Sequence, residues 1–357
     1  MTDLLDRAEA TSVRAPSRAV IRIGPLSWRV ERRLAWTSLA LLGVLLGIFA
    51  LSMVLGDYPV PLADIPAAVL GQGPDDIRFV VKTLRLPRAL TGVLVGAAFG
   101  LSGALLQRVT GNVLASPDIV GITAGASAAA VALIVIGATS VATVTLGALA
   151  GGIVVAALVY ALAWRQGVDG YRLVLVGIGL SSASMAVVQY LLTRADLTDA
   201  SQAMVWLTGS LNGRSWDHVV PITLVLAVLV PPTLLGGRSL RALQLGDDAA
   251  RQLGLRVETA RGLLVLASVL LAAVAVAAAG PVAFVALAAP AIASRVTGSG
   301  GVALVPAMVV GACMLLGADL VAQHLLGGLP VGVATAMVGA PYLLYLLSAA
   351  TRFGVTR

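Results

Sequence analysis

Long apolar stretches separated by short polar connections run along most of the chain. A helix that crosses a membrane needs about 20 predominantly apolar residues, and by this measure the pattern predicts about ten such helices between residues 34 and 350. Two stretches contain Pro117 and Pro290 together with Gly and Ser, which predicts short or broken helices of the kind that line a cavity. The predicted spans are 34–55, 88–107, 113–136, 139–164, 172–192, 218–236, 262–280, 282–297, 302–322 and 328–350.

Composition supports a helical membrane protein. Hydrophobic residues make up 59% of the 357 and charged residues 11%, against roughly 25% charged in an ordinary soluble domain. The apolar stretches do not alternate with polar residues, so a lipid-facing β-barrel is excluded. One cysteine and two histidines are too few for an internal disulfide or a His/Cys metal site. We therefore expect an all-α polytopic membrane protein with no directly bound metal or cofactor.

The distribution of charge predicts the orientation in the membrane. Arginines crowd residues 1–33 ahead of the first span, and the positive-inside rule places such a tail in the cytosol. This tail lacks the apolar core of a signal peptide and is polar enough to be disordered. An even number of spans returns residues 351–357 to the same side, together with the arginine-rich segment 238–261. We expect a multi-pass protein of the inner or plasma membrane, with domain 34–350 in lipid and both termini cytosolic. We attribute the net charge of +7 to topology and expect no nucleic-acid partner.

A short polar helix is predicted inside the segment 238–261. Gly246 and Gly254 flank it, and Asp247 and Arg251 stand at i,i+4, where they can pair. It is either an ordinary solvated connection or a rigid element that docks into a motor subunit. The chain lacks a G-x-x-x-x-G-K-[ST] phosphate loop, since its one lysine, Lys82, has no glycine frame. If transport is driven by ATP, hydrolysis needs another chain.

Two arginines and a row of glycines mark the second predicted span. Burying Arg at the bilayer centre costs about 2.5–3.5 kcal/mol, so Arg85 and Arg88 should lie in water at the outer interface. They are either anchors or ion-pair partners for acidic residues of an extracytoplasmic protein. Gly92, Gly96 and Gly100 repeat every four residues, which predicts a helix face for close packing or for lining a wide passage.

Two other functions have local support in the sequence. The stretch 100–103 has the G-x-S-G form of an intramembrane serine protease, with Ser102 as nucleophile and His324 as a conceivable base. Such matches are common in glycine-rich chains, and His324 lies at a predicted span end. Asp118 and Asp319 are acids within predicted spans and could couple transport to an ion gradient. Each is more simply explained by local capping or pairing.

Taken in order, several stretches resemble the FecCD-type permeases of ABC importers for iron-siderophores, haem and cobalamin. Any one stretch is a weak match, but their order and spacing are specific, and together they cover about residues 35–350. The matching stretches are Arg85-Leu86-Pro87-Arg88, Gly96-Ala97-Ala98, Ser102-Gly103, Asn112 to Pro117 with Gly121, Trp206-Leu207-Thr208-Gly209-Ser210 with Trp216, Leu245-Gly246 to Gly254, Gly280-Pro281-Val282-Ala283-Phe284-Val285, Ala318-Asp319 and Leu329-Pro330-Val331-Gly332.

The resemblance implies a transport subunit that does no chemistry of its own. Two permease subunits would enclose one path, two ATP-binding subunits would bind and hydrolyse ATP, and an extracytoplasmic siderophore-binding protein would deliver cargo. By position, Arg85 and Arg88 would receive acidic residues of that protein. The ATPase-coupling residues would be Asp247, Asp248, Ala250, Arg251, Leu253 and Gly254, and the cytoplasmic gate would be formed by Asn112, Leu114, Gly170 and Tyr171.

Further details of the resemblance favour one subgroup. Ala288-Ala289-Pro290 looks like the version found in permeases that pair with a second, different permease in ferric-catecholate importers. This implies a heterodimer that carries a ferric siderophore, with cobalamin and haem as the alternatives. The chain departs from many relatives at Pro290-Ala291, where they have Pro-His, and at Gln323, where they often have Arg. The outer docking contact of that arginine is therefore not carried over.

Overall fold

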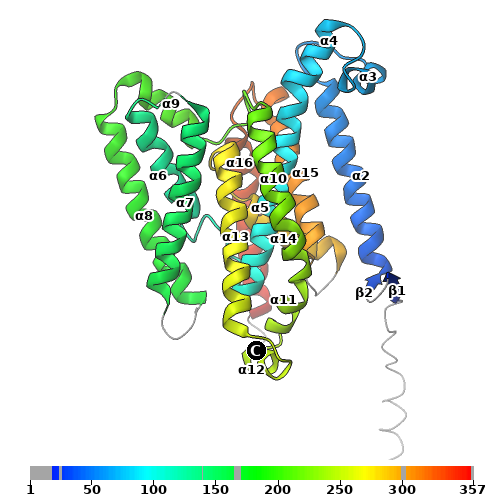
Figure 1. Cartoon of the computed structure of the whole chain (residues 1–357), viewed down its shortest axis with the longest axis vertical. Helices are drawn as coiled ribbons and strands as arrows, with labels where there is room; N and C mark the ends of the chain where they lie inside the picture. Colours follow the sequence, from blue (N-terminus) through cyan, green and yellow to red (C-terminus); the bar gives the residue numbers. More distant parts are fainter. Residues whose placement is uncertain (1–17, 24–25, 139, 165–169, 299–302, 355–357) are drawn as a thin grey trace, which may run out of the picture.

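The computed structural model describes residues 18–23, 26–138, 140–164, 170–298 and 303–354. Within them a two-stranded hairpin precedes a bundle of helices (Figure 1). The first elements are β1 (Arg18–Ile23), β2 (Leu26–Glu31), α2 (Arg32–Val54), a 3₁₀ turn (Leu62–Asp64), α3 (Ile65–Val69), α4 (Asp75–Phe79), a π-helical stretch (Val80–Arg85), α5 (Leu86–Thr110), α6 (Ile122–Val135) and α7 (Val141–Ala163). They are followed by α8 (Gly170–Arg194), α9 (Leu197–Leu207), α10 (Trp216–Leu235), α11 (Gly237–Leu243), α12 (Asp247–Gln252), α13 (Val257–Ala279), α14 (Val285–Thr297), α15 (Leu304–His324) and α16 (Val331–Gly354).

The predicted all-α membrane bundle is confirmed. Among the described residues, seven helices are long and apolar enough to cross a membrane, and three shorter apolar helices, α6, α14 and α16, complete the predicted set in its predicted order. The hairpin was not predicted. Its strands pair antiparallel from Arg18 opposite Glu31 to Ile23 opposite Leu26, within the tail expected to be disordered. The overlooked signal is the run of β-branched and aromatic residues at positions 20–30, which favours strands.

Helix α5 lies at the centre of the bundle because its glycines let other backbones approach. A Cβ added at Gly96 would lie 2.4 Å from the carbonyl oxygen of Gly311 in α15, and one at Gly100 would lie 2.1 Å from that of Ala307. At Gly103 the Cβ would lie 1.8 Å from the carbonyl oxygen of Ala286 in α14. Only glycine fits at these three positions, so α5 packs backbone to backbone against two other helices.

Irregular backbone interrupts the bundle at the first predicted broken stretch and at the start of the second, whereas Pro290, the signal for the second break, lies inside the short helix α14. Residues 111–121 separate α5 from α6, and residues 280–284 separate α13 from α14. In the second break Gly280 has φ 77°, and Phe284 has φ 68°, a left-handed conformation that side chains other than glycine rarely adopt. Such backbone is tolerated at membrane depth where it lines a cavity instead of facing lipid.

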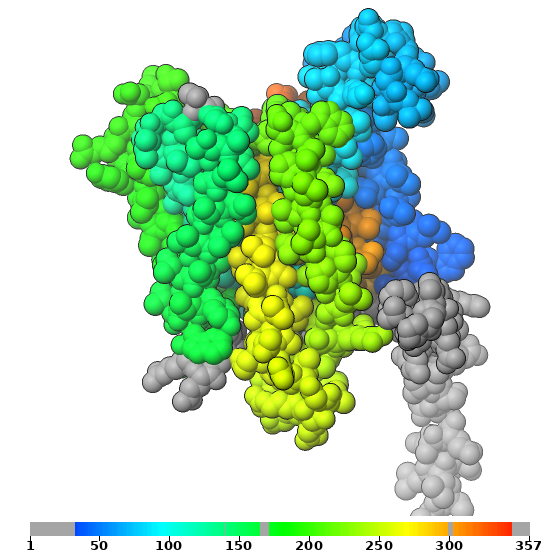
Figure 2. Space-filling model, viewed as in Figure 1, coloured from blue at the N-terminus to red at the C-terminus, as the bar shows by residue number. Residues whose placement is uncertain are grey.

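The two ends of the bundle carry different elements. Helices α3, α4 and α9 lie at the upper end in Figure 1, whereas α11 and α12 form a protrusion at the lower end. The hairpin β1–β2 and the C-terminal end of α16 lie at the lower end too. The space-filling view in Figure 2 shows α10 and α13 together on one face, above this protrusion. The hairpin and the end of α16 thus lie on the same side as α12, as an even number of spans requires.

Candidate functional site

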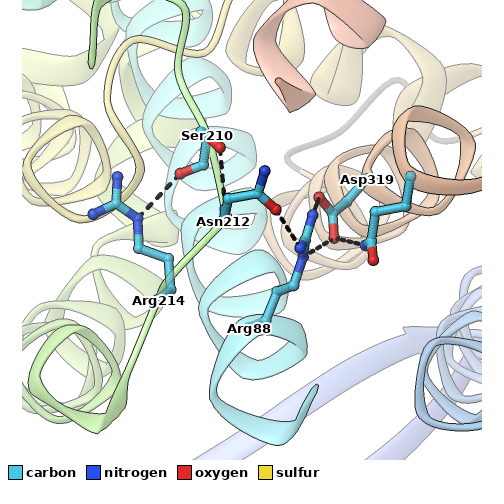
Figure 3. A network of polar contacts seen from close by, with 6 residues as sticks. Arg88, Ser210, Asn212, Arg214 and Asp319 are labelled. Atoms are coloured by element: carbon cyan, nitrogen blue, oxygen red, sulfur yellow. Dashed lines mark hydrogen bonds and ion pairs between the residues drawn. The ribbon is translucent and has the colours of Figure 1, made fainter. Parts of the chain in front are cut away.

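A polar network at the upper end joins α5, α15 and the loop after α9 (Figure 3). Arg88 donates two hydrogen bonds to the Asp319 carboxylate, from Nε to Oδ2 at 2.9 Å and from Nη2 to Oδ1 at 2.8 Å. Its Nη1 donates to Asn212 Oδ1, and Gln323 Nε2 donates to Asp319 Oδ2 at 2.7 Å. The side chains of Arg88 and Asp319 are only 21% and 3% exposed. The pair is therefore buried and bidentate, the geometry in which an arginine–carboxylate contact is strongest.

The prediction that Arg85 and Arg88 lie free in water is wrong. Arg85 Nη1 donates to the carbonyl oxygens of Met53 and Val54 at 2.6 and 3.0 Å, and Nη2 donates to that of Tyr58. The last carbonyls of a helix have no partner within the helix, so Arg85 caps the C-terminal end of α2. Both arginines form internal contacts that sequence spacing does not reveal.

Two neighbours of these arginines differ in exposure. Arg214 donates from Nε to the Ser210 carbonyl oxygen at 3.0 Å, and burial lowers the pKa of its guanidinium to about 10. The Lys82 side chain is exposed and makes no ion pair within the described part of the chain. Of the cations around the π-helical stretch, Lys82 is the one that an external carboxylate can reach without breaking an internal bond.

The protrusion at the lower end contains the short helix predicted between Gly246 and Gly254. Gly246 and Gly254 have φ 95° and 80°, which favours glycine at both positions. The predicted pair between Asp247 and Arg251 is not formed. Arg251 pairs instead with Asp248 at 3.0 Å, and Asp247 accepts from Arg261 of α13 at 2.7 Å. The second contact ties the start of α12 to the membrane helix that follows it.

Apolar side chains cover the tip of this protrusion. Leu245 and Leu253 are each 67% exposed, whereas Ala250 is fully buried against the rest of the protrusion. Exposed leucines on either side of a short helix with an anchored base are suited to contact with another protein. Asp248 and Arg251 add an exposed ion pair beside them.

The four predicted gate residues also lie towards the lower end. Asn112 and Leu114 follow α5, and Asn112 Oδ1 accepts from the Leu114 amide at 2.9 Å, so this pair forms a local turn. Gly170 begins α8, and its side-chain environment lies outside the described part of the structure. Tyr171 is 76% exposed. Asn112 and Leu114 thus lie in the loop after α5, whereas Gly170 and Tyr171 lie at the start of α8. Asn112 and Tyr171 are exposed, and Leu114 is half-buried.

An open cavity of about 610 Å³ lies between α6, α8, α16 and the break before α14. Its wall is mostly apolar with a few polar groups, and Asp118 Oδ1 in that wall accepts from Thr123 Oγ1 at 2.5 Å. The Ser181 hydroxyl is buried there and finds no hydrogen-bond partner among the described residues. Sequence reasoning named Asp118 as an acid within a predicted span but identified no residue as lining a cavity. Of the two prolines taken as signals of broken helices, Pro117 lies in the first break and Pro290 lies inside α14.

Ser102 does not have the surroundings of a nucleophile. It is fully buried, and its Oγ donates to the Ser268 carbonyl oxygen at 2.7 Å. Gly100, two residues before it, faces Ala307, which precedes His324 by 17 residues, or about 25 Å along a helix. Ser102 and His324 therefore cannot form a dyad.

Comparisons with known proteins extend this picture. Residues 44–349 match the FecCD transport family. The chain is 40% identical to the ferric enterobactin transport system permease protein FepG of Escherichia coli, over 89% of this chain and 97% of that protein. It is 39% identical to the iron(3+)-hydroxamate import system permease protein FhuG of Bacillus subtilis, over 84% and 93%. For the cobalamin import system permease protein BtuC of Halobacterium salinarum the identity is 35%, over 92% and 91%. A solved metal-chelate type ABC transporter in an inward-facing conformation superposes with a TM-score of 0.77 at 28% identity, covering 88% of this chain and 99% of that one.

Proposed function

Because the chain belongs to the FecCD transport family, we propose that it is the permease subunit of an ATP-driven importer that moves a ferric siderophore from a binding protein into the cytoplasm. The observation that carries this proposal is that the similarity to FepG, named for ferric enterobactin transport, spans 97% of that protein at 40% identity. The chain itself contributes a passage and docking surfaces and performs no catalysis.

The protrusion of α11 and α12 is the contact with the ATP-binding subunits in this proposal. It projects beyond the bundle (Figure 1) and displays Leu245 and Leu253. Its coupling residues are Asp247, Asp248, Ala250, Arg251, Leu253 and Gly254. The ion pair between Asp247 and Arg261 would transmit a push on α12 directly to α13. This end, with both chain termini, is then cytosolic, and ATP binds to the two partner subunits.

A second permease subunit would close the open cavity. Its lining comes from α6, α8, α16 and the break before α14, and the cavity is open and not enclosed. A different permease as partner, as the Ala288-Ala289-Pro290 stretch suggests, would complete the passage as a heterodimer. Asn112, Leu114, Gly170 and Tyr171 would then form the cytoplasmic gate. ATP-driven movement of the two halves would switch the path between outward-open and inward-open states.

The extracytoplasmic binding protein would dock at the upper end. Lys82 can offer its charge to a carboxylate there without loss of an internal bond, since it makes no ion pair within the described residues. Arg85 and Arg88, the residues carried over from the family, can contribute only with donors that their internal bonds leave free. We therefore place the centre of the docking surface on the π-helical stretch 80–85.

Uptake of radioactive iron bound to a siderophore tests the proposal. Cells with and without the gene are compared, each with and without an ionophore that collapses ion gradients while ATP is maintained. Gene-dependent uptake that survives the ionophore supports the proposal. Uptake abolished by the ionophore would favour ion-coupled transport. Gene-dependent uptake of cobalamin or haem without iron-siderophore uptake would assign the chain to that branch of the family.

A further inference from the structure

Phe284, at the end of the break before α14, has an unfavourable backbone conformation. Its φ of 68° is the one positive φ of a residue other than glycine in the described part of the chain. A left-handed backbone brings Cβ close to the following carbonyl oxygen, so few residues other than glycine adopt it. Such a conformation persists only where the surrounding packing holds it, and it is typical of segments that switch. The contacts of Phe284 therefore indicate what the conformation does.

The Phe284 side chain packs against the bare backbone of α16 at Gly339. A Cβ added at Gly339 would lie 2.3 Å from both Cβ and Cγ of Phe284, so the ring fits because position 339 is a glycine. Gly339 is buried, and Phe284 is half-buried. Val333 and Ala336 of the same helix line the open cavity, and Ala336 precedes Gly339 by about one helical turn. The ring thus contacts α16 next to the part of it that forms the cavity wall.

The same break contacts α16 a second time, through backbone. The Gly332 amide, in the first turn of α16, donates to the Gly209 carbonyl oxygen at 3.1 Å. A Cβ added at Gly332 would lie 3.3 Å from the carbonyl oxygen of Pro281, and Pro281 and Ala283 line the cavity beside it. The segment of α16 in the cavity wall is therefore held at both ends, by backbone at Gly332 and by one aromatic ring at Gly339.

The break is also the end of α13, the helix that is tied to the protrusion. Arg261, near the start of α13, pairs with Asp247 of α12, and α13 runs without interruption from Val257 to Ala279. Most of its apolar length is buried inside the bundle. A continuous, packed helix carries a displacement from one end to the other. A movement of α12 therefore reaches Phe284 through α13.

We propose that Phe284 is a positioning residue that latches α16 to the end of α13. When α13 shifts, the break moves, the ring leaves Gly339, and α16 is free to change the width of the cavity. The inference rests on the proposed function, in which ATP-driven movement opens the path. Once the ring is released, the Phe284 backbone can relax to an ordinary negative φ. The latch thus has two discrete arrangements, which coupling between distant sites requires.

Accessibility of the cavity wall tests the latch without any need for a known cargo. The transporter, purified with its partner subunits, carries Cys313→Ala, which removes the single cysteine of this chain, and Ala336→Cys, which places a thiol in the wall. A water-soluble maleimide labels this thiol with and without ATP plus vanadate. We expect ATP to change the labelling rate about tenfold, within the roughly 5–150-fold range of allosteric couplings. Phe284→Ala and Phe284→Gly should each abolish most of this change.

The two Phe284 variants separate a latch from a purely structural role. Both remove the ring, but glycine accepts a positive φ and alanine does not, so Phe284→Gly should unfold at a higher temperature than Phe284→Ala. A latch predicts an equal loss of the ATP response in both, whereas a structural role predicts that the response follows stability. Gly339→Ala should also reduce the response, because its methyl group displaces the ring. If the two residues act through one contact, Phe284→Ala/Gly339→Ala should be no worse than Phe284→Ala.

Leu133→Ala is the matched control. Leu133 is also half-buried and packs on a glycine of a neighbouring helix, with Cδ1 2.0 Å from a Cβ added at Gly147, but it does not line the cavity. This variant should keep the full ATP response. A response that persists in both Phe284 variants, or that is lost equally in Leu133→Ala, would overturn the latch. So would equal labelling of the Ala336→Cys transporter with and without ATP. A response lost only in the Phe284 variants, with no siderophore uptake by any complex, would support the latch and refute the proposed function.

Discussion

The buried pair of Arg88 and Asp319 should stabilise the upper end of the bundle by an amount that can be measured. Removing one partner of a buried ion pair leaves the other charge uncompensated, which costs about 3–5 kcal/mol. Arg88 retains the bond to Asn212 and is 21% exposed, so the lower end of this range applies. We expect Asp319→Asn and Arg88→Met each to reduce the free energy of unfolding by about 3 kcal/mol.

The double variant separates the pair from its two members. The double variant Arg88→Met/Asp319→Asn leaves no uncompensated charge, so it should cost less than either single variant, which implies a coupling energy of more than about 3 kcal/mol. Unfolding by SDS in mixed micelles, followed by tryptophan fluorescence, measures all four proteins. The exposed pair of Arg78 and Asp75, at 43% and 89% exposure, is the matched control, and Asp75→Asn should cost well under 1 kcal/mol.

Two results would refute this reasoning. Additive effects of Arg88→Met and Asp319→Asn would mean that the side chains act independently. A cost for Asp319→Asn no greater than that of Asp75→Asn would mean that water screens Arg88 as fully as an exposed arginine. The charge reversal Arg88→Glu should lower the free energy of unfolding more than either single variant, because it brings two carboxylates together. Loss of binding-protein docking in that variant would therefore report unfolding and not a lost contact.

Three further outcomes follow from the packing. Gly100→Val should abolish folded protein on size-exclusion chromatography, since its Cβ would lie 2.1 Å from a carbonyl oxygen, whereas Gly43→Ala, with nothing within 4 Å, should be silent. Leu253→Asp should weaken co-purification with the ATP-binding subunits at least tenfold. It should leave the melting temperature of the isolated permease unchanged, because the Leu253 side chain is exposed. Unchanged co-purification would exclude Leu253 from the contact with those subunits. Ser102→Ala removes a hydrogen bond to Ser268, which should lower the free energy of unfolding by about 1 kcal/mol and preserve uptake. Complete loss of uptake in a stably folded variant would indicate a chemical role for Ser102.

Much of the architecture can be predicted from the sequence because it depends on local properties. The length of an apolar run decides whether a helix spans the membrane, so the ten helices could be predicted in order. Gly246, Gly254 and Pro117 act through their own backbone, so the short helix and the first break could be placed too. The second break lies at residues 280–284, ahead of Pro290, which stands inside α14. The hairpin of residues 18–31 was missed because the charge of the tail was given more weight than its strand-forming residues.

The tertiary structure decided which charged groups meet. Arg88 and Asp319 are separated by 231 positions, and Arg85 reaches back to the end of α2 across about 30 residues, as its bonds to Met53 and Val54 show. Asp247 pairs with Arg261 of the next membrane helix, α13, and not with Arg251 of its own helix. Helix spacing and burial choose these partners, because a charge that loses water on packing must pair with whichever opposite charge the fold brings within reach. The chain alone determines the helices and their breaks, whereas their packing determines which arginines remain free to meet a partner.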